Sequence, residues 1–197
     1  WTHGRTLRQI SILDPRLFPN DPKELQPLLG QRINWVRRRA KWGLIGFEDH
    51  VLSFHLRMTG RWLKESEGKG SDRVRARLEL DDGEGLLFDD VRRLGRMELW
   101  PISGWEHALE KRGLGPEPWP IMRDGAWWQQ RLAGRRCAIK PALMRQDWVA
   151  GLGNIAGSEI CFRAAIDPRR LASTLNPAEW DAIGRAVRDY IECTLAQ

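Results

Sequence analysis

Gly151, Gly153 and Asn154 stand in one tight turn, where they could form a binding site for an anion. Residues 149–157 read VAGLGNIAG and separate two segments of helical character. Glycine permits positive φ and the close approach of another molecule's backbone. Asn154 can cap the helix that follows, whose first amide N–H groups would bind an anion. In a basic chain, the expected anion is a nucleic-acid phosphate.

The charge of the chain supports a nucleic-acid partner. Its 197 residues carry 32 lysines and arginines against 26 acids, a net charge of +6 at pH 7 and a pI of about 9.7. Most of the basic residues are arginines, which pair with phosphate through two parallel hydrogen bonds and stack on bases. Residues 31–41 hold five basic side chains and no acid, and Lys41 ends the run. On residues alone, this run is also explained as a charged strand edge that resists aggregation.

Other candidate residues also have plain structural explanations. Met58 ends an apolar strand face, which suggests core packing. Arg92 and Arg93 could be an exposed pair in a surface turn. Asn154 could serve as a helix cap and nothing more, although capping and phosphate binding are compatible.

Alternating apolar and polar residues predict antiparallel strands in the first half of the chain. In Val51–Met58, the apolar residues from Leu52 onward share one face and the polar residues share the other. Asp81-Asp82-Gly83 is a hairpin turn signal, and Glu65–Asp72 is a loop rich in Gly, Ser and charge. The pattern indicates a β-sandwich. The other expected strands are Thr6–Leu13, Ile33–Arg37, Leu44–Phe47, Arg73–Leu80, Leu86–Phe88 and Met97–Trp100.

The second half has helical patterns. Pro141 stands where a helix is expected to begin, and Asn176 with Pro177 and Glu179 forms a near-complete helix start signal. Trp180, Ile183, Val187 and Ile191 then line one helical face. The predicted class is therefore α+β, an antiparallel β-sandwich followed by a helical domain. The expected divisions are a β domain over 1–112, a Gly- and Pro-rich linker over 113–120 and a helical domain over 121–197.

Cysteine usage and hydropathy narrow the class of protein. Cys137, Cys161 and Cys193 are far apart, lack the spacing of a zinc site and are expected to be buried thiols in a reducing compartment. No apolar run approaches the roughly 18 residues of a membrane span. We therefore expect no metal site, no membrane partner and a location in the cytoplasm or nucleoid. We also expect a monomer.

Four segments together resemble the formamidopyrimidine-DNA glycosylase / endonuclease VIII family, whose members excise oxidised bases from DNA. His55–Gly60 is similar to the family's strand-end motif, and Asp90–Gly95 to its DNA-inserting loop. Leu114–Pro118 is similar to its interdomain segment, and Val149–Glu159 to its helix–two-turns–helix module. The four occur in the family's order. The resemblance implies the same two-part architecture, with duplex DNA in the cleft between the parts.

The resemblance implies that one group of residues fills the space left by a flipped nucleotide. Met58 would enter the gap, Arg92 would contact the base opposite the lesion and Leu94 would wedge into the stack. Leu94 replaces the family's aromatic residue, and Val91 replaces a proline. The preferred lesion and the preferred opposite base do not follow from the sequence.

A second group is implied to bind phosphates. It comprises Lys41, Arg93, Lys140, Gly153 and Asn154. Ala156 stands where many family members have a tyrosine, and Arg73 is the nearest counterpart of a histidine in the second alternating strand. Glu159 is expected to be structural.

The family's reactive groups are an N-terminal proline and the glutamate after it. The resemblance places both upstream of Trp1, together with the first helix, so no catalytic residue is expected within this chain. The family also continues beyond the position of Gln197 into a zinc finger or a zincless equivalent, so zinc is expected only in such a longer protein. A longer parent would be a bifunctional DNA glycosylase and lyase acting on a damaged base or abasic site, and the chain by itself would be inactive.

Two alternatives remain open. The chain could be a non-catalytic module that binds damaged DNA or strand junctions. The helical half could instead bind nucleic acid in a structural role, although Met58 and Arg92 in the β half argue against this. The true first residues of the gene would separate these possibilities.

Overall fold

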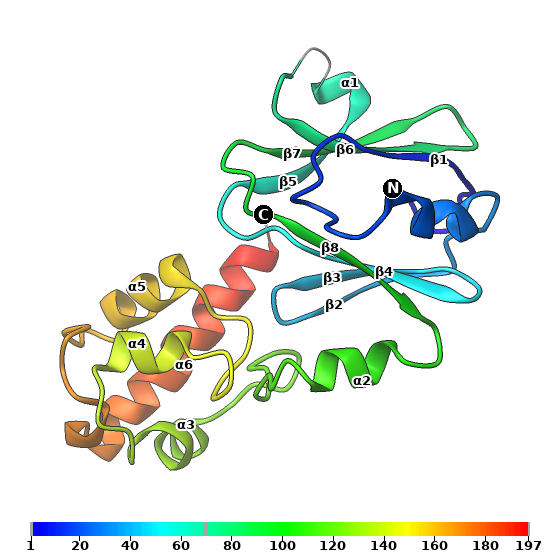
Figure 1. The fold of residues 1–197 in the computed structure, drawn as a ribbon. Helices are drawn as coiled ribbons and strands as arrows, with labels where there is room; N and C mark the ends of the chain where they lie inside the picture. Colours follow the sequence, from blue (N-terminus) through cyan, green and yellow to red (C-terminus); the bar gives the residue numbers. More distant parts are fainter. Residues whose placement is uncertain (1, 69–70, 197) are drawn as a thin grey trace. The chain divides into compact units, whose positions relative to one another are not determined.

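The computed structural model describes residues 2–68 and 71–196. It divides into two compact units, Trp1–Leu109 and Glu110–Gln197 (Figure 1). Trp1, Gln197 and part of the predicted 65–72 loop, Lys69 and Gly70, lie outside the described residues.

The first unit is a sandwich of two antiparallel four-stranded sheets, which confirms the predicted fold class. The order in one sheet is β1-β6-β7-β5, with β1 Leu7–Ile12, β6 Val74–Leu80, β7 Gly85–Asp90 and β5 Gly60–Lys64. The order in the other is β2-β3-β4-β8, with β2 Trp35–Arg39, β3 Trp42–Gly46, β4 His50–His55 and β8 Arg96–Pro101. Three short helices accompany the sheets: the 3-10 helix η1 (Pro22–Leu28), α1 (Glu65–Gly68) and α2 (Trp105–Glu110).

Apolar side chains from both sheets form one core, which holds the sandwich together. Phe88 of β7, Leu52 of β4 and Met97 of β8 are completely buried in it. Burying side chains of this size stabilises the fold by roughly 1.5–3 kcal/mol each. The predicted hairpin turn is present between β6 and β7, and Gly83 adopts a φ of +80° there.

Two details of the strand prediction are wrong. β4 ends at His55 rather than Met58, and its residue Ser53 is buried, so the strand does not have one solvated face. The Ser53 hydroxyl is satisfied by donating to the carbonyl of Glu98, 3.1 Å away. The sequence analysis also missed β5, because a five-residue strand with adjacent Trp62 and Leu63 shows no clear alternation.

The second unit packs four helices around its own core. They are α3 (Gly125–Leu132), α4 (Ile139–Met144), α5 (Asn154–Arg163) and α6 (Pro177–Leu195), with a 3-10 turn, η2, at Ala172–Thr174. Trp128, Ile160 and Trp180 are completely buried in this core.

The predicted start of α6 is confirmed, whereas the predicted start of α4 is wrong by two residues. α6 begins with the predicted capping box, in which Asn176 and Glu179 each bond the other's backbone N–H. α4 begins at Ile139, so Pro141 is its third residue rather than its first. A proline is tolerated there because the first-turn N–H groups have no partner within the helix.

The prediction of three buried cysteines is wrong for two of them. Only Cys161 is buried, whereas Cys137 is half-buried and Cys193 is exposed. Cys193 lies near the end of α6, where the helix leaves the core. Burial raises the pKa of Cys161 to about 11, so its thiol stays protonated at neutral pH.

Candidate nucleic-acid interface

Three loops meet at one end of the β-sandwich, and strand register brings them together. Trp42 at the start of β3 pairs with His55 at the end of β4, and His55 pairs with Arg96 at the start of β8. The β2–β3 hairpin, the β4–β5 turn and the β7–β8 loop therefore lie at the same end. Gly60 pairs with Asp90, which joins the second and third of these loops across the other sheet.

Met58 points into solvent from the β4–β5 turn. Its side chain is 71% exposed, so the interpretation as core packing is wrong. Arg57 adopts a φ of +55°, and the Gly60 N–H bonds the Leu56 carbonyl at 2.9 Å to close the turn. A side chain at Gly60 would put its Cβ 2.5 Å from that carbonyl oxygen, so glycine is required. The turn thus holds the thioether outward.

The carboxylate of Asp90 holds the β4–β5 turn and the β7–β8 loop together. It accepts hydrogen bonds from the Thr59 hydroxyl at 2.5 Å and from the Arg92 N–H at 3.2 Å. Its other oxygen accepts from the N–H groups of Leu94 and Gly95, each at 2.8 Å. Burial raises the pKa of Asp90, but these hydrogen bonds outweigh burial and hold that pKa below its ordinary value. The sequence analysis missed Asp90. The signal for it was an acid pair closing an apolar strand directly before a basic turn.

Arg92 and Leu94 both extend from the loop that Asp90 organises. Arg92 is exposed and its Nη1 contacts the sulfur of Met58 at 3.0 Å. Leu94 is 39% exposed, and Val91 beside it is 52% exposed. The structure therefore gathers the three residues predicted to fill the vacated space.

Arg93 is anchored to the sandwich. Its Nε donates to the buried carboxylate of Asp14 at 2.6 Å, and its backbone has a φ of +56°. Burial raises the pKa of Asp14, but the hydrogen bonds from Arg93 and the Arg16 N–H outweigh burial and lower it. The Arg93 side chain remains 44% exposed, which leaves room for a phosphate to approach it. The sequence analysis did not find this pair, since its partners lie 79 positions apart.

The basic run of residues 31–41 divides between a strand and a turn. Arg37, Arg38 and Arg39 lie on β2, the edge strand of its sheet, which confirms the charged strand edge for those three. Lys41 is exposed in the β2–β3 hairpin, and partial removal of its ammonium from water lowers its pKa. Arg73 lies outside this run, directly before β6, and its Nε is 3.7 Å from the carboxylate of Asp89.

In the second unit, the segment predicted to bind an anion lies at the first turn of α5, with one correction. Gly153 is the N-cap, and Asn154 is the first helical residue and makes no capping hydrogen bond with its side chain. The interpretation of Asn154 as a plain cap is therefore wrong, and its exposed amide is available to a ligand. The N–H groups of Asn154, Ile155 and Ala156 have no acceptor within the helix, because they belong to its first turn.

Gln146 fixes the turn that precedes α5. Its side-chain amide donates to the carbonyls of Met144 and Leu152, both at 2.8 Å, and accepts from the Gly151 N–H at 2.9 Å. Gly151 has a φ of +103° there, a backbone conformation that residues with a side chain rarely adopt. Gln146 was not identified from the sequence, because a lone glutamine carries no pattern.

Close packing of α4 on α5 brings Lys140 near this site. A Cβ on Gly157 would lie 3.4 Å from Lys140 Cγ and 3.3 Å from Met144 Cγ. The Lys140 side chain therefore packs along α5, within one turn of Asn154. Glu159 pairs with Arg163 at 2.9 Å, consistent with a structural role.

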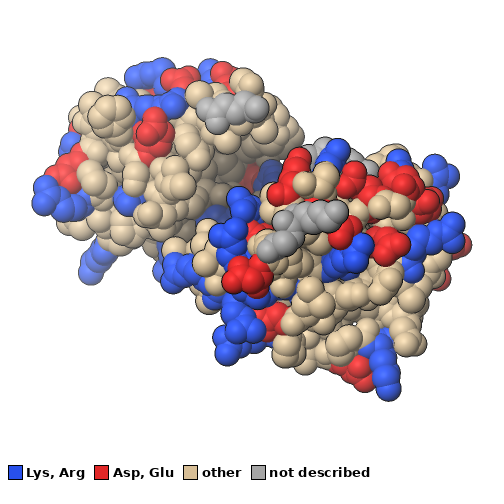
Figure 2. Space-filling view, turned by 90° about the horizontal axis from the view of Figure 1, so that it is seen from above, with Lys and Arg blue, Asp and Glu red and all other residues tan. Residues whose placement is uncertain are grey.

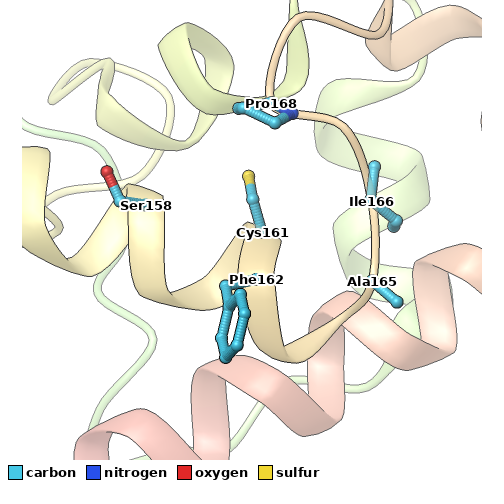
Figure 3. A pocket seen from close by; sticks show the side chains of 6 residues that line it. All are labelled: Ser158, Cys161, Phe162, Ala165, Ile166 and Pro168. Carbon is cyan, nitrogen blue, oxygen red and sulfur yellow. The ribbon is translucent and has the colours of Figure 1, made fainter.

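A depression of about 460 Å³ lies on the other part of α5 and carries no evident chemistry. Figure 3 shows Cys161 pointing towards Pro168 and Phe162 pointing away from it. The lining is mainly apolar, and its one ionisable group is the Cys161 thiol, whose pKa burial raises to about 11.

Acids offset much of the basic charge. Figure 2 shows Lys and Arg side chains interspersed with Asp and Glu on the face in view. Several arginines are paired to acids, among them Arg61 to Asp89 at 3.0 Å and Arg145 to Asp147 at 2.6 Å. The net charge therefore describes the candidate surface of each unit less well than the contacts given above.

Within residues 2–68 and 71–196, the structure shows neither a metal-binding cluster nor a membrane-spanning helix. No group of three His, Cys, Asp or Glu side chains is placed to hold a metal ion there. No helix in this described part is both long and apolar enough to cross a membrane.

Two family models match this chain. Residues 1–97 match the formamidopyrimidine-DNA glycosylase N-terminal domain, and residues 114–197 match the formamidopyrimidine-DNA glycosylase H2TH domain. The chain belongs to the formamidopyrimidine-DNA glycosylase family. The resemblance seen in the sequence is thereby confirmed.

Curated members of the formamidopyrimidine-DNA glycosylase family match nearly the whole chain. The formamidopyrimidine-DNA glycosylase of Paracoccus denitrificans is 39% identical over 206 residues, covering 98% of this chain and 72% of its own length. The enzyme of that name from Pseudomonas paraeruginosa is 36% identical over 190 residues, covering 95% of this chain and 70% of its own.

Solved structures of the Lactococcus lactis enzyme, Fpg, share the fold. Its complex with DNA containing FAPY-dG has a TM-score of 0.89 and 25% identity, covering 99% of this chain and 74% of that chain. Its complex with DNA containing an abasic site has a TM-score of 0.89 and 25% identity, covering 98% and 73%.

Proposed function

We propose that this chain acts in base-excision repair as a DNA glycosylase that flips damaged bases out of duplex DNA. The observation that carries the proposal is the gathering of Met58, Arg92 and Leu94 on loops at one end of the sandwich. The names of the curated relatives and the damaged DNA in the Lactococcus lactis complexes support it. In a bacterium, such a protein works at the nucleoid.

In this proposal, one set of residues stabilises the extruded state. Extruding a nucleotide costs a few kcal/mol of lost stacking and pairing. Met58 and Leu94 replace part of the lost stacking, because flexible or branched apolar side chains fit an irregular gap. Arg92 satisfies the hydrogen-bonding groups of the unpaired base on the opposite strand.

Another set holds the sugar–phosphate backbone. Lys41, Arg93 and Lys140 neutralise phosphates, while the Asn154 amide and the N–H groups that follow Gly153 donate hydrogen bonds. These contacts fix the register of the duplex without reading its sequence. A monomer suffices, since every residue in this assignment comes from one chain.

We further propose lyase chemistry for a protein that carries the family's N-terminal proline and glutamate. A secondary amine attacks C1′ of the sugar, the base leaves and a Schiff base forms, after which the strand is cleaved. The glutamate moves the protons. Neither residue is present at the start of the 197-residue chain, so we expect the chain as it stands to bind DNA without cleaving it.

The test uses duplexes of one sequence with and without a single abasic site. The chain should bind the abasic duplex more tightly, and borohydride should trap no covalent adduct. A trapped adduct would show that another amine, such as that of Lys41 or Lys140, attacks the sugar, and the inactivity proposed for the chain would be wrong. Equal affinity for the two duplexes would contradict the proposed function.

The alternative is a module that recognises damaged DNA or junctions without catalysis. The two proposals differ in one observation. A chain extended to the first residue of its gene forms a borohydride-trapped adduct if it is an enzyme, and forms none if it is a binding module.

A further inference from the structure

We propose that Asp90 is a positioning residue that makes Met58 and Arg92 enter DNA as one unit. The inference rests on the proposed function, since it concerns how the residues that fill the vacated space are held. Asp90 itself does not reach DNA, because its side chain is buried with 1% exposure.

The carboxylate of Asp90 bonds to both loops. Thr59 belongs to the turn that carries Met58, and its hydroxyl donates to Asp90 Oδ1. The same hydroxyl accepts from the Arg92 N–H at 3.1 Å, so the two loops also bond directly to each other. The Arg92 N–H lies 3.2 Å from Asp90 Oδ1, and the Leu94 and Gly95 N–H groups bond Oδ2. Moving either loop alone breaks bonds that the other loop shares.

Burial of the Asp90 charge makes its hydrogen bonds costly to lose. A buried carboxylate is tolerated only where donors surround it, and leaving it partly unsatisfied is costly. The four donors described here are one hydroxyl and three backbone N–H groups, all from the two loops. The carboxylate therefore strongly disfavours any arrangement in which one loop has separated from the other.

Each of the two loops contains one residue with a strained backbone. Arg57 and Arg93 adopt left-handed φ values of +55° and +56°, one in each loop. Non-glycine residues keep such values only where the surrounding structure fixes them. Asp14 anchors Arg93, and Asp90 bonds the residues on both sides of it, Arg92 and Leu94. The strained turn is therefore preformed rather than induced.

Asp89 provides a matched control on the same strand. It is buried to the same extent, with 1% exposure. Its carboxylate bonds Arg61 Nε at 3.0 Å and the Ser71 hydroxyl at 3.0 Å, neither of which belongs to the two loops. Replacing Asp89 removes a buried carboxylate without touching Met58 or Arg92.

The experiment compares Asp90→Asn and Asp89→Asn in the 197-residue chain. The affinity for an abasic duplex is divided by that for the undamaged duplex, and thermal unfolding is recorded for each variant. An asparagine amide can accept on only one side, so Asp90→Asn loses either the bonds from Leu94 and Gly95 or those from Thr59 and Arg92. We expect its affinity ratio to fall about tenfold, as for groups coupled in one network. Asp89→Asn should lower the melting temperature and leave the ratio unchanged.

Thr59 gives a milder version of the same test. Thr59→Ser keeps the hydroxyl and should keep the ratio, whereas Thr59→Val removes it and should lower the ratio. This pair decides the question if Asp90→Asn does not fold. In a double-mutant cycle, the effects of Met58→Ala and Arg92→Ala on the affinity ratio should be non-additive in the otherwise unmutated chain. They should be additive when Asp90→Asn is also present.

The outcomes separate the two claims. Suppose that the unmutated 197-residue chain prefers the abasic duplex, and that Asp90→Asn and Asp89→Asn change the affinity ratio equally. This result overturns the positioning role alone. The same holds if Thr59→Val leaves the ratio intact. If the unmutated 197-residue chain shows no preference for the abasic duplex, the proposed function is overturned, and this inference with it.

Discussion

The guanidinium of Arg92 contacts the sulfur of Met58 at 3.0 Å, although the two residues are 34 positions apart. Each side chain comes from a different loop and each is exposed. The contact joins a polarisable apolar group to a rigid hydrogen-bond donor at one point on the surface. One can fill a gap in a base stack while the other satisfies the base left unpaired.

Replacing Met58 by alanine should impair DNA recognition and leave the fold intact. Because its side chain is 71% exposed, unfolding by urea should change by less than about 0.5 kcal/mol, as for other surface positions. Binding to an abasic duplex should weaken about tenfold, since the side chain offsets part of the cost of extrusion.

Met58→Leu is the matched control, because leucine keeps the apolar volume and should retain most of the affinity. A loss of about 2–5 kcal/mol in Met58→Ala would instead be the signature of a core residue.

Affinity for DNA should depend steeply on salt. Each neutralised phosphate contributes about −0.9 to the slope of log affinity against log salt. The four proposed phosphate contacts therefore predict a slope of about −3 to −4. They are made by Lys41, Arg93, Lys140 and the start of α5. Lys41→Ala and Lys140→Ala should each make the slope about one unit shallower. Lys23→Ala on η1 removes the same charge away from the three loops and should not. A flat response would mean that this surface does not meet DNA.

Gln146→Ala should disorder the turn before α5. Three hydrogen bonds of its amide are lost, and we expect unfolding by urea to show a stability lower by about 1–3 kcal/mol. DNA affinity should fall while the salt slope stays constant, because no charge is removed. Gln130→Ala, at an exposed position on α3, should change neither quantity. An unchanged affinity for Gln146→Ala would show that the turn does not position the anion site.

Acid should destabilise the sandwich through Asp14 and Asp90. Both folded-state pKa values lie below the ordinary 3.8, so both carboxylates stabilise the fold above pH 3.8. That contribution is lost as the pH falls from 3.8 through the lower folded values. Urea unfolding from neutrality to about pH 2 should show the loss, and Asp14→Asn should reduce it. A stability that rises with acid in this window would contradict these shifts.

The cysteines should react with a thiol reagent in the order of their exposure. Cys193 should be labelled first and Cys137 more slowly. Cys161 should react only on unfolding, because it is buried and its pKa is raised to about 11. Mass spectrometry of the labelled peptides gives the order, and early labelling of Cys161 would show that α5 opens readily.

The periodic parts of the sequence predicted the elements that bury apolar side chains. The alternation of Val74–Leu80 and the spacing of Trp180, Ile183 and Val187 each match the structure, since local pattern alone decides which face is apolar. β5 was missed, because its place in the sheet comes from pairing with β7 and not from its own residues.

The candidate site residues came from motifs, whereas the roles of their supporting residues did not. Met58, Arg92 and Asn154 belong to segments with recognisable order. Asp90 opens one of these segments, but the segment does not reveal what its carboxylate binds, and Gln146 has no periodic or motif signal of its own. Both act through bonds to backbone groups. Such bonds depend on where loops end in space, which the spacing of residue types does not encode.

By itself, the sequence determined the fold class and the family, because these follow from local patterns and ordered motifs, and it predicted which residues meet DNA. Only the tertiary structure decided that Met58 is exposed, that Arg93 is anchored to Asp14 and that Gly153 rather than Asn154 caps α5. The reason is that a buried charge selects its donors by distance in three dimensions. Thr59 and Asp90 are 31 positions apart in the chain, and strand pairing alone brings them together.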